Sequence, residues 1–124
     1  MILGVGTDLL DIRRIGQALE RTPRLAERIL TTTELEQFGA SSQPVNFLAK
    51  RFAAKEAAVK ALGTGIGRGI SWQHFAISHD SLGRPLIEMS GGALEKAEQR
   101  GIRQIHISYS DETDHVVAFA VAES

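Results

Sequence analysis

Residues 2–9 alternate between two faces, a pattern typical of a β-strand. One face carries Leu3, Val5 and Thr7, and the other carries Gly4, Gly6 and Asp8. Because glycine has no side chain, the second face leaves room for another element to approach the strand closely beside a carboxylate.

Apolar residues recur at helical spacing from Asp11 to Leu30, and Pro23 divides this segment into two helices. A short third helix ending near Gly39 is predicted next. It can begin at either of two capping boxes, Thr31-x-x-Glu34 or Thr33-x-x-Glu36.

A long helix is predicted from Pro44 to Leu62, because proline suits the first turn and apolar residues line two sides of the segment. Charged side chains in such a buried helix are costly unless they are paired or used. Lys55 projects into the main apolar stripe, whereas Glu56 and Lys60 lie one turn apart on its flank.

The C-terminal half is dominated by strand patterns. The predicted elements are strands at 71–79 and 85–90 joined by a turn at 80–83, a helix at 92–100, and a second hairpin from strands at 104–110 and 115–123. Helices come first and antiparallel strands follow, so the fold class is α+β, with an antiparallel sheet packed around the long helix.

The composition narrows the functional class. A chain of 124 residues forms one domain, 1–124, with a modest core, a size compatible with oligomerisation. The absence of cysteine excludes disulfides, zinc–thiolate sites and cysteine catalysis. A formal net charge of −1 gives no global attraction to nucleic acid or membrane. With no signal-peptide pattern or membrane span, we expect a cytoplasmic protein.

Positive charge is nevertheless concentrated between residues 12 and 28. This stretch holds Arg13, Arg14, Arg21, Arg24 and Arg28 against Glu20 and Glu27. The arginines are either a solvated helical face or a docking patch for an acidic partner, since arginine pairs well with carboxylates.

Three residues are candidates for chemistry at a phosphate. Asp8 is either a helix cap or turn carboxylate, or a magnesium ligand. Glu56 either forms a salt bridge with Lys60 at i,i+4 spacing or supplies a second metal ligand. Lys60 either stabilises the C-terminal end of the helix dipole, or contacts a phosphate or protonates a leaving group.

Four alternate glycines from Gly63 to Gly69 follow the long helix. The run matches neither the P-loop nor the dinucleotide-binding pattern, so it is either a flexible connector or an anion-binding loop. The four histidines show no metal-ligand spacing. His106, on the polar face of its strand, is the histidine of most interest.

Taken together, these residues resemble the bacterial holo-(acyl-carrier-protein) synthases, the small trimeric 4′-phosphopantetheinyl transferases. The resemblance is carried by Gly4-Val-Gly-Thr-Asp8, the RLAERIL segment at 24–30, the block from Arg51 to Gly65, and Gly83-Arg-Pro85. It covers nearly the whole chain, and the long block with Asp8 upstream is its most specific part.

The resemblance implies transfer of phosphopantetheine from coenzyme A to a serine of apo acyl carrier protein, with release of 3′,5′-ADP, for fatty-acid biosynthesis. Asp8 and Glu56 would hold Mg²⁺ at the CoA pyrophosphate, and Lys60 would stabilise the leaving phosphate. The serine proton could pass to Asp8, to Glu56 or to a water on the metal.

The resemblance also assigns further contacts with coenzyme A. Arg51 and His106 would meet its other phosphates, while Gly63, Gly65 and Pro85 would shape the nucleotide pocket. A chain with a single module would complete its site with a neighbour, so a homotrimer with interfacial active sites is implied.

Carrier proteins are acidic around the modified serine, which gives the arginine patch a partner. The docking residues would be Arg14, Arg21, Arg24 and Arg28. Two rival functions are a non-catalytic binding module for coenzyme A or a nucleotide, and an RNA-binding protein. The joint presence of Asp8, Glu56 and Lys60 favours an enzyme, and the sparse aromatic residues argue against RNA.

Overall fold

A computed structural model describes all residues, 1–124. In chain order the elements are β1 (Ile2–Asp11), α1 (Ile12–Arg21), α2 (Leu25–Ile29), α3 (Thr32–Ala40), α4 (Pro44–Leu62), the 3₁₀ turn η1 (Trp72–His74), β2 (Phe75–His79), β3 (Pro85–Met89), α5 (Gly91–Gln99), β4 (Gln104–Asp111) and β5 (His115–Glu123). Helices precede most of the strands, so the α+β prediction is confirmed.

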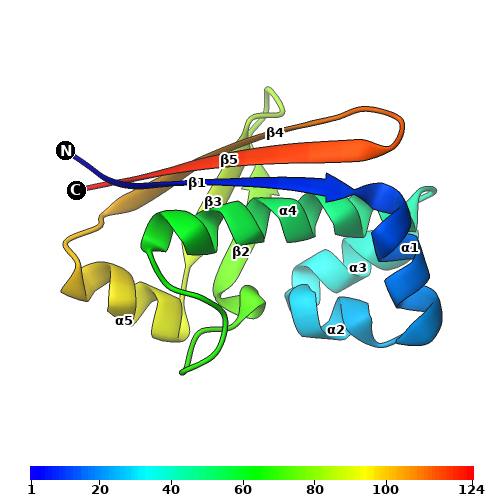
Figure 1. The fold of residues 1–124 in the computed structure, drawn as a ribbon, viewed down its shortest axis with the longest axis horizontal. Helices are drawn as coiled ribbons and strands as arrows, with labels where there is room; N and C mark the ends of the chain where they lie inside the picture. The colour runs from blue at the N-terminus through cyan, green and yellow to red at the C-terminus, as the bar shows by residue number, and fades with distance from the viewer.

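The strands form two antiparallel sheets. The larger has the order β1-β5-β4, and the smaller is the β2-β3 hairpin. Helix α4 lies beneath the larger sheet and contacts all three of its strands. Helices α1 to α3 cluster near one end of α4, and α5 lies near the other (Figure 1).

Local signals set both ends of α4. Pro44 occupies the first turn, where its missing N–H has no intrahelical partner to lose. Gly63 ends the helix in the left-handed conformation, with φ of 86°, which glycine adopts without a Cβ clash. The predicted bounds of this helix are therefore correct. No helix in the structure has the length and apolar character needed to cross a bilayer.

Helix α4 packs on β1 at main-chain contact distance. A Cβ placed on Gly4 would lie 2.0 Å from the carbonyl oxygen of Ala61, and one placed on Gly6 would lie 2.0 Å from that of Ala57. Only glycine fits at either position, because no real Cβ comes so near a backbone oxygen. The predicted close approach at this strand face is confirmed.

A buried ionic cluster joins α3, α4 and β2. Glu34 accepts hydrogen bonds from Lys55 Nζ at 2.6 Å and Arg51 Nη1 at 3.1 Å, and from the backbone N–H of Ile77. Burial alone would raise the pKa of Glu34, but its hydrogen bonds and the charge of Lys55 prevail, so the pKa lies below 4.5. Burial lowers the pKa of Lys55, with Glu34 opposing that change.

One prediction of local structure is wrong, and one alternative is now decided. Residues 71–79 do not form one strand, because Ser71 caps the 3₁₀ turn η1 before β2 begins at Phe75. Of the two capping boxes, only that of Thr31 and Glu34 forms: Glu34 N–H donates to the Thr31 hydroxyl, and the Glu34 carboxylate accepts from the Thr31 N–H.

The face of the larger sheet that turns away from α4 carries exposed apolar side chains on β1 and β5, while its β4 strand is polar. On β1 it carries Val5 and Leu9, and on β5 it carries Val117 and Phe119, all of them exposed. Cross-strand pairing places Leu9 directly opposite Val117. These side chains form a continuous apolar surface, which in monomers is usually small or functional.

Candidate active site

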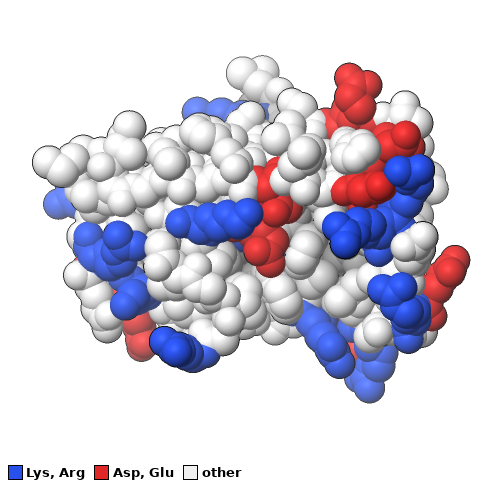
Figure 2. Space-filling model, viewed as in Figure 1, with Lys and Arg blue, Asp and Glu red and all other residues white.

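The register of α4 on β1 brings the predicted chemical residues together. Gly4 lies against Ala61 and Gly6 against Ala57, so each two-residue step along the strand matches about one turn of the helix. Continuing this step places the next inward residue, Asp8, at the turn of α4 that begins at Ala53 and includes Glu56. Acidic atoms are exposed near the middle of this face, where β1 runs beside α4 (Figure 2).

Lys60 is held at β1 rather than along its own helix. Its Nζ donates to the Thr7 carbonyl oxygen at 2.8 Å and lies 3.5 Å from Oδ1 of Asp8. The Lys60 side chain is 53% exposed and that of Asp8 is 17% exposed. The ammonium thus sits at the open rim of the site, where it can reach a bound anion.

Glu56 has a partner that the sequence pattern did not indicate. Its Oε1 accepts a hydrogen bond of 2.9 Å from Nε1 of Trp72, the first residue of η1. No salt bridge joins Glu56 to Lys60, and Asp8 caps no helix, since the cap of α1 is Asp11. The interpretation of Asp8 as a helix cap and that of Glu56 as a salt-bridge partner of Lys60 are therefore both wrong.

The donor set suits Mg²⁺ together with a phosphate ligand. Nowhere do three or more His, Asp or Glu side chains gather into a metal cage. Magnesium is usually held by one or two carboxylates, with waters and substrate phosphates completing its shell. Asp8 and Glu56 supply two carboxylates, and Trp72 leaves Oε2 of Glu56 without a hydrogen bond.

The glycine loop beyond α4 lines a hollow of about 460 Å³. Gly63 and Gly65 contribute backbone to its wall, and Arg68 and Lys96 contribute cationic side chains. The hydroxyl of Thr64, in the same loop, is the one buried side-chain polar atom without a hydrogen-bond partner. Bare backbone, positive charge and an unpartnered hydroxyl favour an anion site over a simple connector.

Pro85 and His106 share a different hollow, of about 150 Å³, between β3 and β4. His106 Nε2 lies 2.6 Å from Oε1 of Glu123, and this contact lowers the pKa of Glu123. None of the glycine-loop residues lines this hollow. Within one protomer the structure does not bring Pro85 and His106 to Asp8 and Glu56.

Arg51 does not face either hollow. Its side chain is 7% exposed. The guanidinium donates to Glu34, to the carbonyl oxygen of Ile77 at 2.7 Å and to Gln37. With these donors engaged by the protein, Arg51 is placed to stabilise the fold rather than to bind a phosphate.

The arginines of the N-terminal helices are exposed, and basic side chains gather over α1 and α2 on the right of Figure 2. Arg24 is paired with Glu27 at 2.7 Å and Arg13 with Asp11 at 2.8 Å. Arg14, Arg21 and Arg28 form no ion pair within the chain. These three therefore offer their full charge to a partner.

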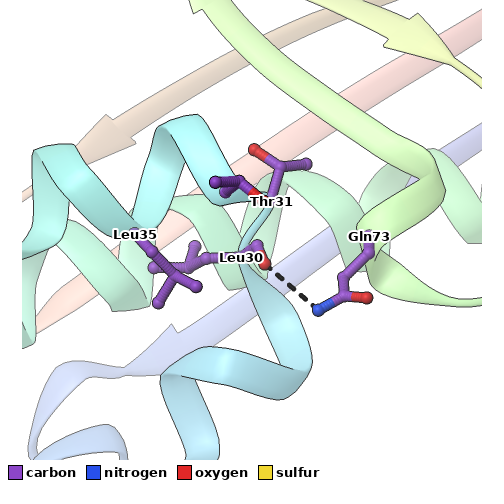
Figure 3. Close-up of a pocket in the computed structure, with 5 residues that line it drawn as sticks. Leu30, Thr31, Leu35 and Gln73 are labelled. Carbon is purple, nitrogen blue, oxygen red and sulfur yellow. Dashed lines mark hydrogen bonds between the residues drawn. The ribbon is translucent and has the colours of Figure 1, made fainter.

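A small hollow of about 230 Å³ lies between η1 and the α2–α3 junction. Figure 3 shows Gln73 directed toward the backbone at Leu30, with Thr31 and Leu35 on the opposite wall. Gln73 Nε2 donates to the carbonyl oxygens of Glu27 at 2.5 Å and Leu30 at 3.3 Å. This contact anchors η1, and hence Trp72, to α2.

Comparison with known proteins identifies the class. The family model of the 4′-phosphopantetheinyl transferase superfamily matches residues 4–120. The chain belongs to this superfamily. Among its relatives, a holo-(acyl-carrier-protein) synthase of Vibrio cholerae serotype O1 is 55% identical, with 99% of this chain and 98% of the relative covered.

Solved structures agree. The holo-(acyl-carrier-protein) synthase of Neisseria meningitidis superimposes with a TM-score of 0.92 at 47% identity, and 100% of both chains is covered. The synthase of Bacillus anthracis in complex with CoA (3′,5′-ADP) has a TM-score of 0.83 at 35% identity, covering 100% of this chain and 98% of the other.

Proposed function

We propose that this protein is a holo-(acyl-carrier-protein) synthase. It transfers 4′-phosphopantetheine from coenzyme A to a serine of apo acyl carrier protein, and thereby supplies holo carrier for fatty-acid biosynthesis. The observation that carries this proposal is the contact of Lys60 on α4 with Asp8 on β1, one helical turn from Glu56, in a chain 55% identical to a holo-(acyl-carrier-protein) synthase. Residues 1–124 act as one transferase domain, which we place in the cytoplasm.

In the reaction, the serine oxygen forms a bond to the β-phosphorus of coenzyme A, and the pyrophosphate bond breaks to release 3′,5′-ADP. Asp8 and Glu56 are the residues that would hold Mg²⁺, which would neutralise charge on the pyrophosphate. Lys60, tethered to the Thr7 carbonyl at 2.8 Å, directs its positive charge toward the leaving phosphate. The serine proton is lost beside two carboxylates that can accept it.

Coenzyme A would lie along the glycine loop, with the backbone at Gly63 and Gly65 against its phosphates. The unpartnered Thr64 hydroxyl supports a ligand at this position. Pro85 and His106 would contact another part of the nucleotide. Arg51 contributes indirectly, by holding α4 against β2 through Ile77.

We also propose that the protein forms a homotrimer with active sites at its interfaces, with α4 central in each protomer. Two observations support this assembly. The hollow at Pro85 and His106 is separate from the Asp8 site within a protomer, so a neighbour can supply it. The outward sheet face around Phe119 is apolar and exposed, as expected of a surface covered by another copy.

The acidic carrier protein would dock on α1 and α2. The docking residues are Arg14, Arg21, Arg24 and Arg28, all exposed. Arginine binds carboxylates in a two-pronged geometry, which positions as well as attracts the partner.

The test is the intact mass of apo acyl carrier protein after incubation with this protein, coenzyme A and Mg²⁺. We expect the carrier to gain one phosphopantetheine unit, and expect EDTA to prevent the gain. The Glu56→Gln variant should fold and show no turnover, which controls for contaminating activity. Tight binding of coenzyme A without any gain in mass would replace this proposal with the non-catalytic binding module.

A further inference from the structure

The segment after the glycine loop ends in a contact with the candidate metal site. Trp72, the single tryptophan of the chain, donates its indole N–H to Oε1 of Glu56 at 2.9 Å. The indole is a donor only, so it can serve Glu56 as a hydrogen-bond donor but cannot ligate a cation. We propose that Trp72 is a positioning residue, which fixes the Glu56 carboxylate so that its other oxygen faces the metal; this inference rests on the magnesium site of the proposed function.

The indole is itself fixed from several sides. Its ring packs on Phe52, with the ring centroids 5.8 Å apart. The adjoining Gln73 is anchored to the Glu27 and Leu30 carbonyl oxygens (Figure 3), and Ser71 caps the turn. A donor held on a short turn with these anchors has one orientation to offer Glu56.

This geometry gives the two carboxylate oxygens of Glu56 different roles. Oε1 accepts the indole N–H, and Oε2 has no partner in the protein. A carboxylate without such a bond can rotate about its terminal torsion, which is broad for glutamate. Fixing that rotation lowers the cost of ordering Glu56 when Mg²⁺ binds, and groups that orient metal ligands typically change affinity by about 10- to 100-fold.

Trp72 also connects the metal site to the nucleotide site along the chain. It follows the glycine loop, whose residues Gly63 to Ile70 line the adjacent hollow. One residue, Ser71, separates that loop from Trp72, so the glycine loop and the Glu56 contact lie on one short stretch of chain.

The test uses the full-length protein saturated with coenzyme A and lacking carrier protein, so that no turnover occurs. Trp72→Phe keeps an aromatic ring against Phe52, although a smaller one, and removes the N–H donor. We expect its affinity for Mg²⁺ to fall about 10- to 100-fold, with the thermal midpoint nearly unchanged. The matched control, Phe52→Leu, alters the ring contact and keeps the N–H, so its Mg²⁺ affinity should stay within about threefold of wild type.

A second readout is the indole N–H signal in a ¹H–¹⁵N spectrum, which needs no assignment experiment in a chain with one tryptophan. Glu56→Ala should move this signal, because the acceptor is lost. Asp8→Asn should leave it in place and abolish its response to Mg²⁺. An indole signal indifferent to Glu56→Ala would overturn the inference, even if Trp72→Phe failed to fold.

The outcomes separate the two proposals. Normal Mg²⁺ binding by wild type with equal affinity in Trp72→Phe overturns the positioning role and leaves the metal site standing. An indole signal that moves in Glu56→Ala, with no Mg²⁺ binding by wild type, overturns the metal site itself and, with it, the role assigned to Trp72.

Discussion

Lys60 Nζ lies 3.5 Å from Asp8 Oδ1, across the seam between α4 and β1. The lysine does not pair with Glu56, its neighbour one helical turn away, because its Nζ is held on β1 by the Thr7 carbonyl oxygen and by Asp8. Each carboxylate of the site therefore has its own protein partner, a cation for Asp8 and an N–H donor for Glu56. The candidate site thus holds one cation for its two carboxylates, and the remaining negative charge favours binding of a further cation.

Replacing Lys60 tests its role at the leaving phosphate. Lys60→Ala removes a half-exposed side chain, so the fold should be retained, while kcat should fall by about 100-fold because a preorganised charge is lost. Steady-state assays with saturating carrier protein measure this effect. Lys50→Ala, on the same helix, is the control and should retain activity; a Lys60→Ala enzyme with wild-type kcat would contradict the role.

Adding one methyl group to β1 tests its close packing against α4. Gly6→Ala places a Cβ 2.0 Å from the Ala57 carbonyl oxygen, so α4 must move away from β1. We expect a loss of about 1–3 kcal/mol in the free energy of unfolding, together with loss of activity. Gly39→Ala, where no atom lies within 4 Å, is the matched control. Urea unfolding of both variants decides the matter, and equal stabilities would refute the tight seam.

Carrier docking should depend on the unpaired arginines. Arg14→Glu reverses a free charge on α1, so the KM for carrier protein should rise by about 10-fold or more, while the affinity for coenzyme A stays constant. Raising the salt concentration should weaken docking by wild type more than by the variant. Arg103→Glu is the control, because Arg103 is exposed and lies just before β4, away from α1 and α2. An unchanged KM in Arg14→Glu would remove α1 from the docking surface.

Acid should weaken the fold through Glu34. The pKa of Glu34 is lowered in the folded protein, so the ionised carboxylate contributes its full stabilisation above pH 4.5 and loses it as the pH falls through the folded pKa. Glu34→Gln leaves Lys55 buried without a counter-charge, which should cost about 3–5 kcal/mol at neutral pH. Its stability should then change less on acidification than that of wild type.

Urea unfolding between about pH 6 and pH 3 measures this linkage. Glu36→Gln is the matched control, because Glu36 lies on the same helix, is exposed and has no partner. If Glu34→Gln and wild type lost stability in parallel as the pH fell, another group would be responsible.

Assembly should depend on the outer sheet face. Phe119→Glu places a charge on β5 at a side chain that is 45% exposed in the protomer. We expect sedimentation to show a shift from trimer to monomer and expect activity to fall with it. Leu82→Glu, at the 93% exposed tip of the β2–β3 turn, should change neither property. A fully active monomer would contradict the shared active site.

Sequence reasoning succeeded where the determinants are local. Pro44 and Gly63 each mark an end of α4 by backbone chemistry, and both bounds were predicted. The small residues at positions 4 and 6 likewise indicated that Asp8 would meet a buried helix. These signals need no knowledge of distant partners.

It failed where the determinants lie elsewhere in the chain. Trp72 was assigned to a strand at 71–79, yet contacts of η1 with Glu56 and the backbone of α2 hold a 3₁₀ turn there. The destination of Arg51 depended on Glu34, which had been assigned only to a helix cap. In the sequence, the apolar positions around Lys55 were the only sign that this lysine would pair with a buried carboxylate.

The glycine–alanine seam has a consequence for how this enzyme can diversify. At Gly4 and Gly6 the main chain of β1 rests directly on the main chain of α4, so no smaller side chain exists that would bring the two elements closer. We therefore expect new donor or carrier preferences to arise at the periphery, in the glycine loop, the β2–β3 hairpin or the arginine face. A library for altered specificity should vary those segments and keep Gly4, Gly6, Ala57 and Ala61 fixed.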